Sequence, residues 1–390
     1  MRTLIKRIYN FFNTKLNLDH INRNIINSNL VKRIISVWRK PIIIRSRSKT
    51  ILNKKLIFVF IVSWYFNQKI PRAGTKIING YINALDKMDI PYIIIDTTSI
   101  DIILKKIPNP LCFISGSDYR FLTKENLKTL RNYKHFVWVN HWFKNSSDFY
   151  KKYNLPNLSW SNSYCEKILS AKPNFLFTPG TKSTFQYYEK WEDNGQKLIS
   201  LPLACDTSLY HPNVPLRKKF EKMKIVFAGN YLSYKARQFN KYLKPFEKEI
   251  YVFGYNKWPY IHYGGKLPDD LEPSLYKQAL LCPAINEPHA EIIGGDICER
   301  VFKIMGCEGL PITDCIPAHY DIFSKNEIIV PRDLNDYKEK VRKILGDNKL
   351  FEKYRIAGYK AILERHTYVH RVKTILKNLE IEHLINSGDK

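Results

Sequence analysis

The sequence predicts an α/β protein of two domains of similar size, each built on a parallel β-sheet flanked by helices. The chain has 390 residues, more than one ordinary core holds, and 44% of them are hydrophobic and 14% aromatic. Short apolar runs alternate with helical stretches in two cycles, which is typical of parallel sheets. Small or polar residues follow most of these runs, as at the carboxyl ends of parallel strands, where ligands bind.

The first cycle occupies residues 54–212. Its opening run, LIFVFIVSWYF, is 11 residues long, too short to cross a bilayer and rich in the residues of buried parallel strands. A helix is predicted over 74–89, where apolar residues recur at helical spacing. Further strands are predicted at PYIIID, LCFIS, HFVWV, NLSWSNS and NFLFT, in chain order.

The second cycle occupies residues 213–375, followed by a tail at 376–390, with the domain boundary within 211–223. Strands are predicted at MKIVFAGN, EIYVFGYN, ALLCPAIN and LPITDC, and a helix at DICERVFKIMGCEG. The charged segment 333–384 reads as helical. Two such domains joined by one linker place a ligand site in the cleft between them.

Residues 1–53 are expected to form a basic helical extension, because their apolar residues recur at helical spacing. Residues 1–55 contain 14 Lys and Arg against one acid, about half of the net charge of +27. This segment is expected either to meet an anionic membrane surface through residues 1–50 or to pack as a helical hairpin on the body. A third reading is that the charge only maintains solubility.

The start of the chain lacks the pattern of a signal peptide, so we expect a cytoplasmic protein, soluble or peripheral on the cytoplasmic face of the membrane. Nucleic acid is not an expected partner, because the aromatic residues lie in core-like strands and not on a basic face. The seven cysteines are scattered and form no C-x-x-C pair, which argues against a zinc ribbon and favours buried thiols in a reducing compartment.

The motifs of common nucleotide sites are missing. The sequence has neither G-x-G-x-x-G nor a P-loop, so a nucleotide would be held in another way. Eight of the 16 glycines lie between residues 229 and 309, several of them directly after predicted strands, where a backbone can approach a phosphate. No carboxylate pair of the D-x-D type is well placed in the first domain, so no metal is expected.

Four segments together resemble GT-B glycosyltransferases over about residues 198–375. RVFKIMGCEGLPITD (300–314) resembles their R-x-F-E-x-x-x-C-G-x-x-x-x-x-D segment, and it is closest to the glycosyltransferase group 1-like proteins named for CgeB. HTYVHR (366–371) resembles the closing H-T-Y-x-x-R of that group. DIFSKNEIIV (321–330) and LPLACDTSLYHP (201–212) resemble the strand between these motifs and the segment before the hinge.

The resemblance implies two Rossmann-like domains that face each other across a cleft. It implies a nucleotide-diphosphate sugar donor on the second domain and a glycan, lipid or protein acceptor on the first. It also implies transfer with retention and no bound metal or other cofactor. An inverting enzyme would instead need a general base near the acceptor hydroxyl.

Cations after the strand KIVFAG and the start of the following helix are expected to hold the diphosphate. Lysine or arginine there would stabilise the leaving group, and we assign Arg237 this catalytic role. A helix opening near Asp296 would present free N–H groups beside Gly295. The predicted donor-binding residues of the second domain are Asn230, Lys235, Arg237, Gly295, Glu299, Arg300 and Glu308. Alternatively, Lys235 and Arg237 are surface cations, and Arg300 is an ion-pair partner of Glu299 or Asp314.

In the first domain, His141 is expected to face the donor sugar, or else to be a half-buried core residue beside tryptophan. Asp118 follows a strand and is the candidate general base or acceptor ligand. Gly74 and Thr75, between the first strand and its helix, are the candidate contacts to the diphosphate.

Lys303 departs from the family pattern, which has glutamate there to hold the donor ribose. A lysine cannot accept hydrogen bonds from hydroxyls, so Glu299 or Glu308 would have to replace it. A non-catalytic binding or structural protein is therefore one alternative function, and a nucleotide-sugar epimerase or glycerophosphate transferase of the same fold is another.

Overall fold

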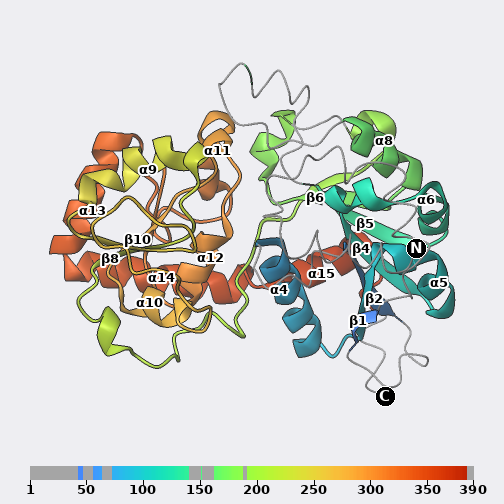
Figure 1. The fold of residues 1–390 in the computed structure, drawn as a ribbon, viewed down its shortest axis with the longest axis horizontal. Coiled ribbons are helices and arrows are strands. Elements are labelled where there is room, and N and C mark those ends of the chain that lie inside the picture. Colours follow the sequence, from blue (N-terminus) through green and yellow to red (C-terminus); the bar gives the residue numbers. More distant parts are fainter. Residues whose placement is uncertain are drawn as a thin grey trace, which may run out of the picture.

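The computed structural model describes residues 43–46, 56–63, 73–139, 151, 162–187 and 191–383. Two lobes lie side by side, and each contains β-strands flanked by helices (Figure 1). Most of the predicted N-terminal extension and the candidate His141 lie outside the described residues. Within the described ranges, no helix combines the length and the apolar character needed to cross a membrane.

The first lobe contains a seven-stranded sheet in the order β1-β3-β2-β4-β5-β6-β7. The strands are β1 (Ile43–Ser46), β2 (Ile57–Val62), β3 (Tyr92–Asp96), β4 (Pro110–Ser115), β5 (Lys134–Trp138), β6 (Phe175–Thr178) and β7 (Leu198–Ser200). Strands β2 to β7 run parallel, and β1 pairs antiparallel with β3 at the edge. The predicted parallel sheet is therefore present.

Two expectations for this lobe are wrong. Residues 43–46, which we assigned to the helical extension, form β1, because this isoleucine-rich stretch fits an open sheet edge better than a helix. The strand predicted at NLSWSNS is also wrong in its last residues, since Asn162 begins helix α8 (Asn162–Ala171). Asparagine and serine favour helix starts, whereas the apolar run that suggested a strand was short.

Alternation along the strands places apolar side chains on both faces of the sheet. Ile57, Val59 and Ile61 of β2 enter one core, while Phe58 and Phe60 enter the other. The helices of this lobe are α4 (Ala73–Lys87), α5 (Ile100–Ile103), α6 (Lys124–Leu130) and α8. Residues 56–62 of the predicted strand are thus buried on two faces of the sheet, as predicted.

The second lobe is organised around four short parallel strands. Strands β8 (Ile225–Ala228) and β9 (Ile250–Phe253) pair in parallel, as do β10 (Cys282–Ala284) and β11 (Pro311–Thr313). A parallel bridge between Ile225 and Leu281 joins the two pairs. The helices are α9 (Ala236–Tyr242), α10 (Glu272–Gln278), α11 (Pro288–Ile293), α12 (Glu299–Gly306), α13 (Leu334–Gly346) and α14 (Asn348–Arg365).

The last helix, α15 (Tyr368–Asn378), returns to the first lobe and packs against α4 (Figure 1). The Tyr368 ring lies 4.9 Å from that of Tyr81, and a Cβ on Gly80 would overlap it, so glycine is required there. The sequence division at residue 375 falls inside this helix. Residues after the H-T-Y motif therefore belong to the core of the first lobe.

The two chain segments that pass between the lobes are fastened to each other. Cys205 bridges to Thr367, with its N–H donating to the His366 carbonyl oxygen at 2.8 Å. The buried Arg371 donates to the carbonyl oxygens of Pro202 (2.6 Å) and Leu203 (3.0 Å).

We predict that Arg371→Ala destabilises the protein by at least about 3 kcal/mol, because several buried carbonyl oxygens lose their donor at once. Urea unfolding of this variant and of Lys377→Ala, an exposed position of the same helix, measures the effect. Equal unfolding midpoints for the two variants would contradict the fastening role of Arg371.

Candidate functional site

The carboxyl edges of the two sheets meet at a direct contact between the lobes. Thr184 follows β6, and a Cβ on Gly295 would overlap its γ-methyl group. The Ser183 hydroxyl donates to the Asp321 carboxylate at 2.6 Å, and Ile293 packs in the core of the first lobe. Because ligands of parallel sheets bind at this edge, the candidate site lies here.

A second contact between the lobes is ionic. Lys76, in the first turn of α4, reaches Asp269 at 2.9 Å and Glu272 at 3.2 Å in the second lobe. Burial alone would raise the pKa of Glu272, but Lys303, Lys76 and the hydroxyls of two tyrosines lower it to about 2. This carboxylate is thus a fixed negative charge beside the start of α4.

Gly74 and Thr75 lie in that same first turn of α4, next to Lys76. A Cβ on Gly74 would meet no atom of the described residues within 4 Å, so space remains beside this backbone in that part of the chain. Asp118, after β4, is only 3% exposed and accepts a hydrogen bond from the Ser63 hydroxyl at 2.7 Å. It lies at the predicted edge of the sheet, but this burial does not present it as an accessible base.

The residues that follow β8 adopt three different arrangements. The Asn230 side chain accepts a hydrogen bond from the Tyr255 N–H at 2.6 Å and so joins the loops after β8 and β9. Lys235 is buried and pairs with Glu287 at 3.2 Å. Arg237 lies in the first turn of α9 with an exposed side chain. Of the two predicted cations, Arg237 is therefore the one open to solvent.

Helix α12 begins at Glu299, three residues later than the sequence predicted. Its Arg300 donates from Nε to the Ala228 carbonyl oxygen at 3.0 Å and from Nη1 to that of Ile285 at 3.3 Å. The guanidinium thereby ties the ends of β8 and β10 to α12. The expected ion pair of Arg300 with Glu299 or Asp314 is replaced by these bonds to backbone oxygens, and Nη2 lies next to Gly229.

Asn286 and Asp314 fix the loop that precedes α12. Asp314 accepts from the backbone N–H of Asn286 at 2.9 Å and from its side-chain amide at 2.5 Å. The Asn286 side-chain oxygen in turn accepts from the Cys298 N–H at 2.7 Å, which is one of the free donors at the helix start. Both residues lie at the carboxyl ends of the predicted strands ALLCPAIN and LPITDC, so the rule that selected Asn230 could have found them.

The two predicted glutamates, Glu299 and Glu308, do not act together. Glu299 begins α12, pairs with Lys303 at 2.6 Å and accepts from the Tyr368 hydroxyl at 3.2 Å. Glu308 lies beyond the other end of this helix and pairs with Lys277 and Arg355. Although its burial acts in the opposite direction, these cations lower the pKa of Glu308. The structure therefore does not bring Glu308 to the strand ends with the other candidates.

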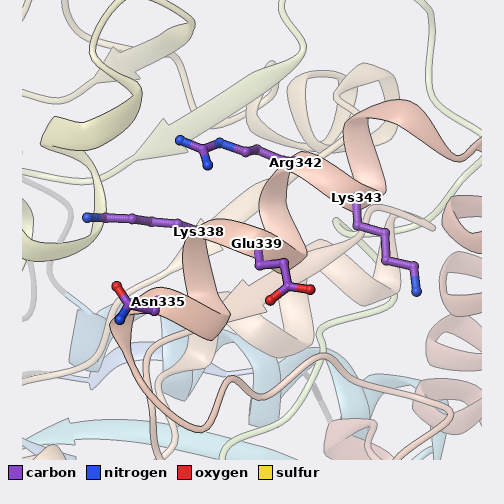
Figure 2. A pocket seen from close by; sticks show the side chains of 5 residues that line it. All are labelled: Asn335, Lys338, Glu339, Arg342 and Lys343. Atoms are coloured by element: carbon purple, nitrogen blue, oxygen red, sulfur yellow. The ribbon is translucent and has the colours of Figure 1, made fainter.

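The described residues contain no group of three or more His, Cys, Asp or Glu side chains that could hold a metal ion. All seven cysteines are free. An open depression of about 700 Å³ lies on α13, away from the strand ends (Figure 2). We place the candidate site at the sheet edges, because ligands of open α/β sheets bind outside the carboxyl ends of the strands.

The fold and part of the sequence match known proteins. Residues 234–377 match the sequence model of the family described as "Glycosyl transferase-like". This match covers most of the second lobe and α15, and it gives no support for the narrower CgeB-like assignment. No curated protein sequence matches the chain.

Solved structures share the fold at low sequence identity. An E. coli structure described as trehalose-6-phosphate bound with UDP-2-fluoro glucose has a TM-score of 0.56 and 10% identity, over 83% of this chain and 99% of that chain. Sucrose-phosphate synthase from Thermosynechococcus elongatus has a TM-score of 0.57 and 10% identity, over 83% of this chain and 99% of that chain. The third structure is the DNA modifying enzyme β-glucosyltransferase, studied with and without uridine diphosphoglucose. It has a TM-score of 0.52 and 12% identity, over 85% of this chain and 99% of that chain. The chain thus has the predicted GT-B fold.

We predict that Gly295→Ala costs about 1–3 kcal/mol, because the added methyl group overlaps Thr184. Thr184→Ser removes that γ-methyl and keeps the hydroxyl, so it should restore part of the loss in the double variant. Gly346→Ala is the control, since a Cβ there meets nothing within 4 Å. Urea unfolding midpoints of Gly295→Ala, Thr184→Ser, the double variant and Gly346→Ala, each compared with the unchanged protein, measure these effects. A double variant that is no more stable than Gly295→Ala would refute the contact.

The Asp314 carboxyl should give the fold a pH dependence of defined sign. Burial raises its pKa to about 7, although Asn286 and the nearby Lys235 oppose the shift and Glu291 adds to it. Folding therefore takes up a proton between pH about 4 and 7, and this contribution to the free energy of unfolding falls as pH rises. Asp314→Asn should remove it.

Three buried histidines make the free energy of unfolding rise with pH over the same pH range, opposite to the effect of Asp314. Burial lowers the pKa of His135 and His319 to about 4, and burial with Arg371 lowers that of His366 to about 3. Their effect is common to both proteins, so the measurement is the difference between the two curves of unfolding free energy against pH. Parallel curves would show that Asp314 keeps its ordinary pKa.

Proposed function

We propose that the protein is a glycosyltransferase that uses a nucleotide-diphosphate sugar, with UDP-sugars as the first donors to test. The observation that carries the proposal is the glycosyl transferase-like match over residues 234–377, in a chain with the GT-B fold. That match contains α12 and the loops after β10 and β11, where the structure gathers Arg300, Asn286 and Asp314. Solved proteins of this fold bind UDP-2-fluoro glucose and uridine diphosphoglucose.

In this proposal the diphosphate lies between the first turn of α4 and the start of α12. Gly74 leaves room for a close approach of the ligand, and the N–H groups that open α12 favour an anion. Arg237 is the exposed cation that would balance the growing negative charge of the leaving diphosphate. Arg300 acts through the backbone that it holds, and we assign it a positioning role.

The chemical step breaks the bond between the anomeric carbon and the diphosphate oxygen and forms one to an acceptor oxygen. We propose retention, with the leaving phosphate taking the proton of the acceptor hydroxyl, and catalysis without a metal ion. The acceptor is a glycan, lipid or protein bound by the first lobe, and we place the reaction in the cytoplasm.

One observation favours a non-catalytic protein of the same fold. Lys303 pairs with Glu299 at 2.6 Å, so this carboxylate already has a cationic partner. If that pair persists when a nucleotide binds, Glu299 cannot take the role that the family pattern gives to a glutamate at position 303. The absence of nucleotide binding would therefore support the non-catalytic alternative.

Thermal shifts with UDP, GDP, CDP, TDP and ADP and their sugars, with and without Mn²⁺, test the donor site. A ligand at about 100 times its dissociation constant adds about 2.7 kcal/mol to stability. We expect one nucleotide to stand out and Mn²⁺ to change nothing. Arg237→Ala should weaken that binding about tenfold, while Lys248→Ala, an exposed cation at the amino end of β9, should not. No shift with any nucleotide would refute the proposal.

A further inference from the structure

The outer face of α14 carries exposed apolar side chains that the packing of the lobe does not explain. The inner face buries Phe351, Ala361 and Ile362 against the rest of the lobe. On the opposite face, Ile356 is 56% exposed and Leu363 is 47% exposed. Apolar residues thus lie on both sides of this helix, and only one side is used by the fold.

Exposed lysines surround these two apolar side chains. At about 100° per residue, five exposed positions fall within an arc of about 80° on the outer face. We call them the α14 stripe: Lys349, Lys353, Ile356, Lys360 and Leu363. Lysine stems can lie along an apolar surface while their charges stay in water, so the stripe has both apolar and cationic character.

Two acids border the stripe, and both have cationic partners. Glu352 pairs with Arg355 at 2.5 Å, and Glu364 pairs with Arg365 at 3.1 Å as well as with the stripe residue Lys360 at 3.8 Å. Arg355 also binds Glu308, and Arg365 also binds Glu327. The stripe itself contains three lysines and no acid.

The preceding helix also carries exposed cations. Helix α13 packs against α14, and its Arg342 and Lys343 are exposed. Figure 2 shows Lys338 and Arg342 extending in the same direction from α13, while Glu339 and Lys343 point elsewhere. Exposed cations therefore lie on two neighbouring helices.

We propose that the α14 stripe docks on an anionic lipid bilayer. Helices of this kind lie in the plane of the interface, with apolar side chains among the headgroups and lysines beside lipid phosphates. Nucleic acid or an acidic protein would satisfy the lysines, but neither accounts for two large apolar side chains between them. The inference does not depend on the proposed function, since it concerns a face away from the strand ends.

Sedimentation of the full-length protein with phosphatidylcholine vesicles, with and without phosphatidylglycerol, tests the docking. We expect binding only to the anionic vesicles. Ile356→Ser with Leu363→Ser should lower the partition coefficient at least tenfold. The control pair is Leu216→Ser with Ile261→Ser, whose side chains are 69% and 67% exposed elsewhere in the second lobe. Because all proteins keep the basic residues 1–42, any binding by that segment is common to them.

A charge pair and an insertion probe complete the test. Lys353→Ser with Lys360→Ser should weaken binding more than Lys105→Ser with Lys106→Ser, two exposed cations of the first lobe. Leu363→Trp should add fluorescence that brominated lipids quench. The proposal is overturned if no vesicle binds the protein, if the stripe variants match their controls, or if the added fluorescence is not quenched.

Discussion

The junction at Arg371 holds together the two stretches of chain that pass between the lobes. Its guanidinium binds carbonyl oxygens before Cys205, and its Nη2 donates to Nδ1 of His366 at 3.1 Å. That histidine can accept because burial and the adjacent Arg371 lower its pKa to about 3, so the ring stays neutral, while Nε2 faces the Ile322 carbonyl oxygen. Burial also lowers the pKa of Arg371, to about 10, which still leaves it charged near neutrality. These bonds join the chain segment around Cys205 to the segment around Thr367.

The ionic contact between the lobes has a different character from the apolar one. If the lobes separate at Lys76, Glu272 still keeps the hydroxyls of Tyr210 and Tyr276 and the nearby charge of Lys303. Its residual partners limit the cost of losing Lys76, because the carboxylate is never left without a donor. The packing of Gly295 against Thr184 has no such substitute. The first contact is thus suited to opening, whereas the second fixes the relative position of the sheet edges.

The candidate site is built mainly from groups that organise backbone. The hydrogen bonds of Arg300 and of the pair Asn286–Asp314 bind backbone groups at the strand ends and at the start of α12. Such groups present helix N–H donors in a fixed direction, which is what recognition of a diphosphate requires. Residue type alone suggested that Arg300 would meet the ligand directly. Its hydrogen bonds instead hold the backbone at Ala228 and Ile285.

The sequence by itself determined the two-domain α/β architecture, because strand burial and helix periodicity are local properties of the chain. It also located the end of the strand that precedes Asn230 and Lys235. Tertiary structure alone decided how α15 crosses back, since Tyr368 fits only against Gly80 on a distant helix. Likewise, it separated Glu308 from Glu299 by pairing each with different cations. Partners distant in sequence set the charge and direction of a side chain, and local patterns carry no record of those partners.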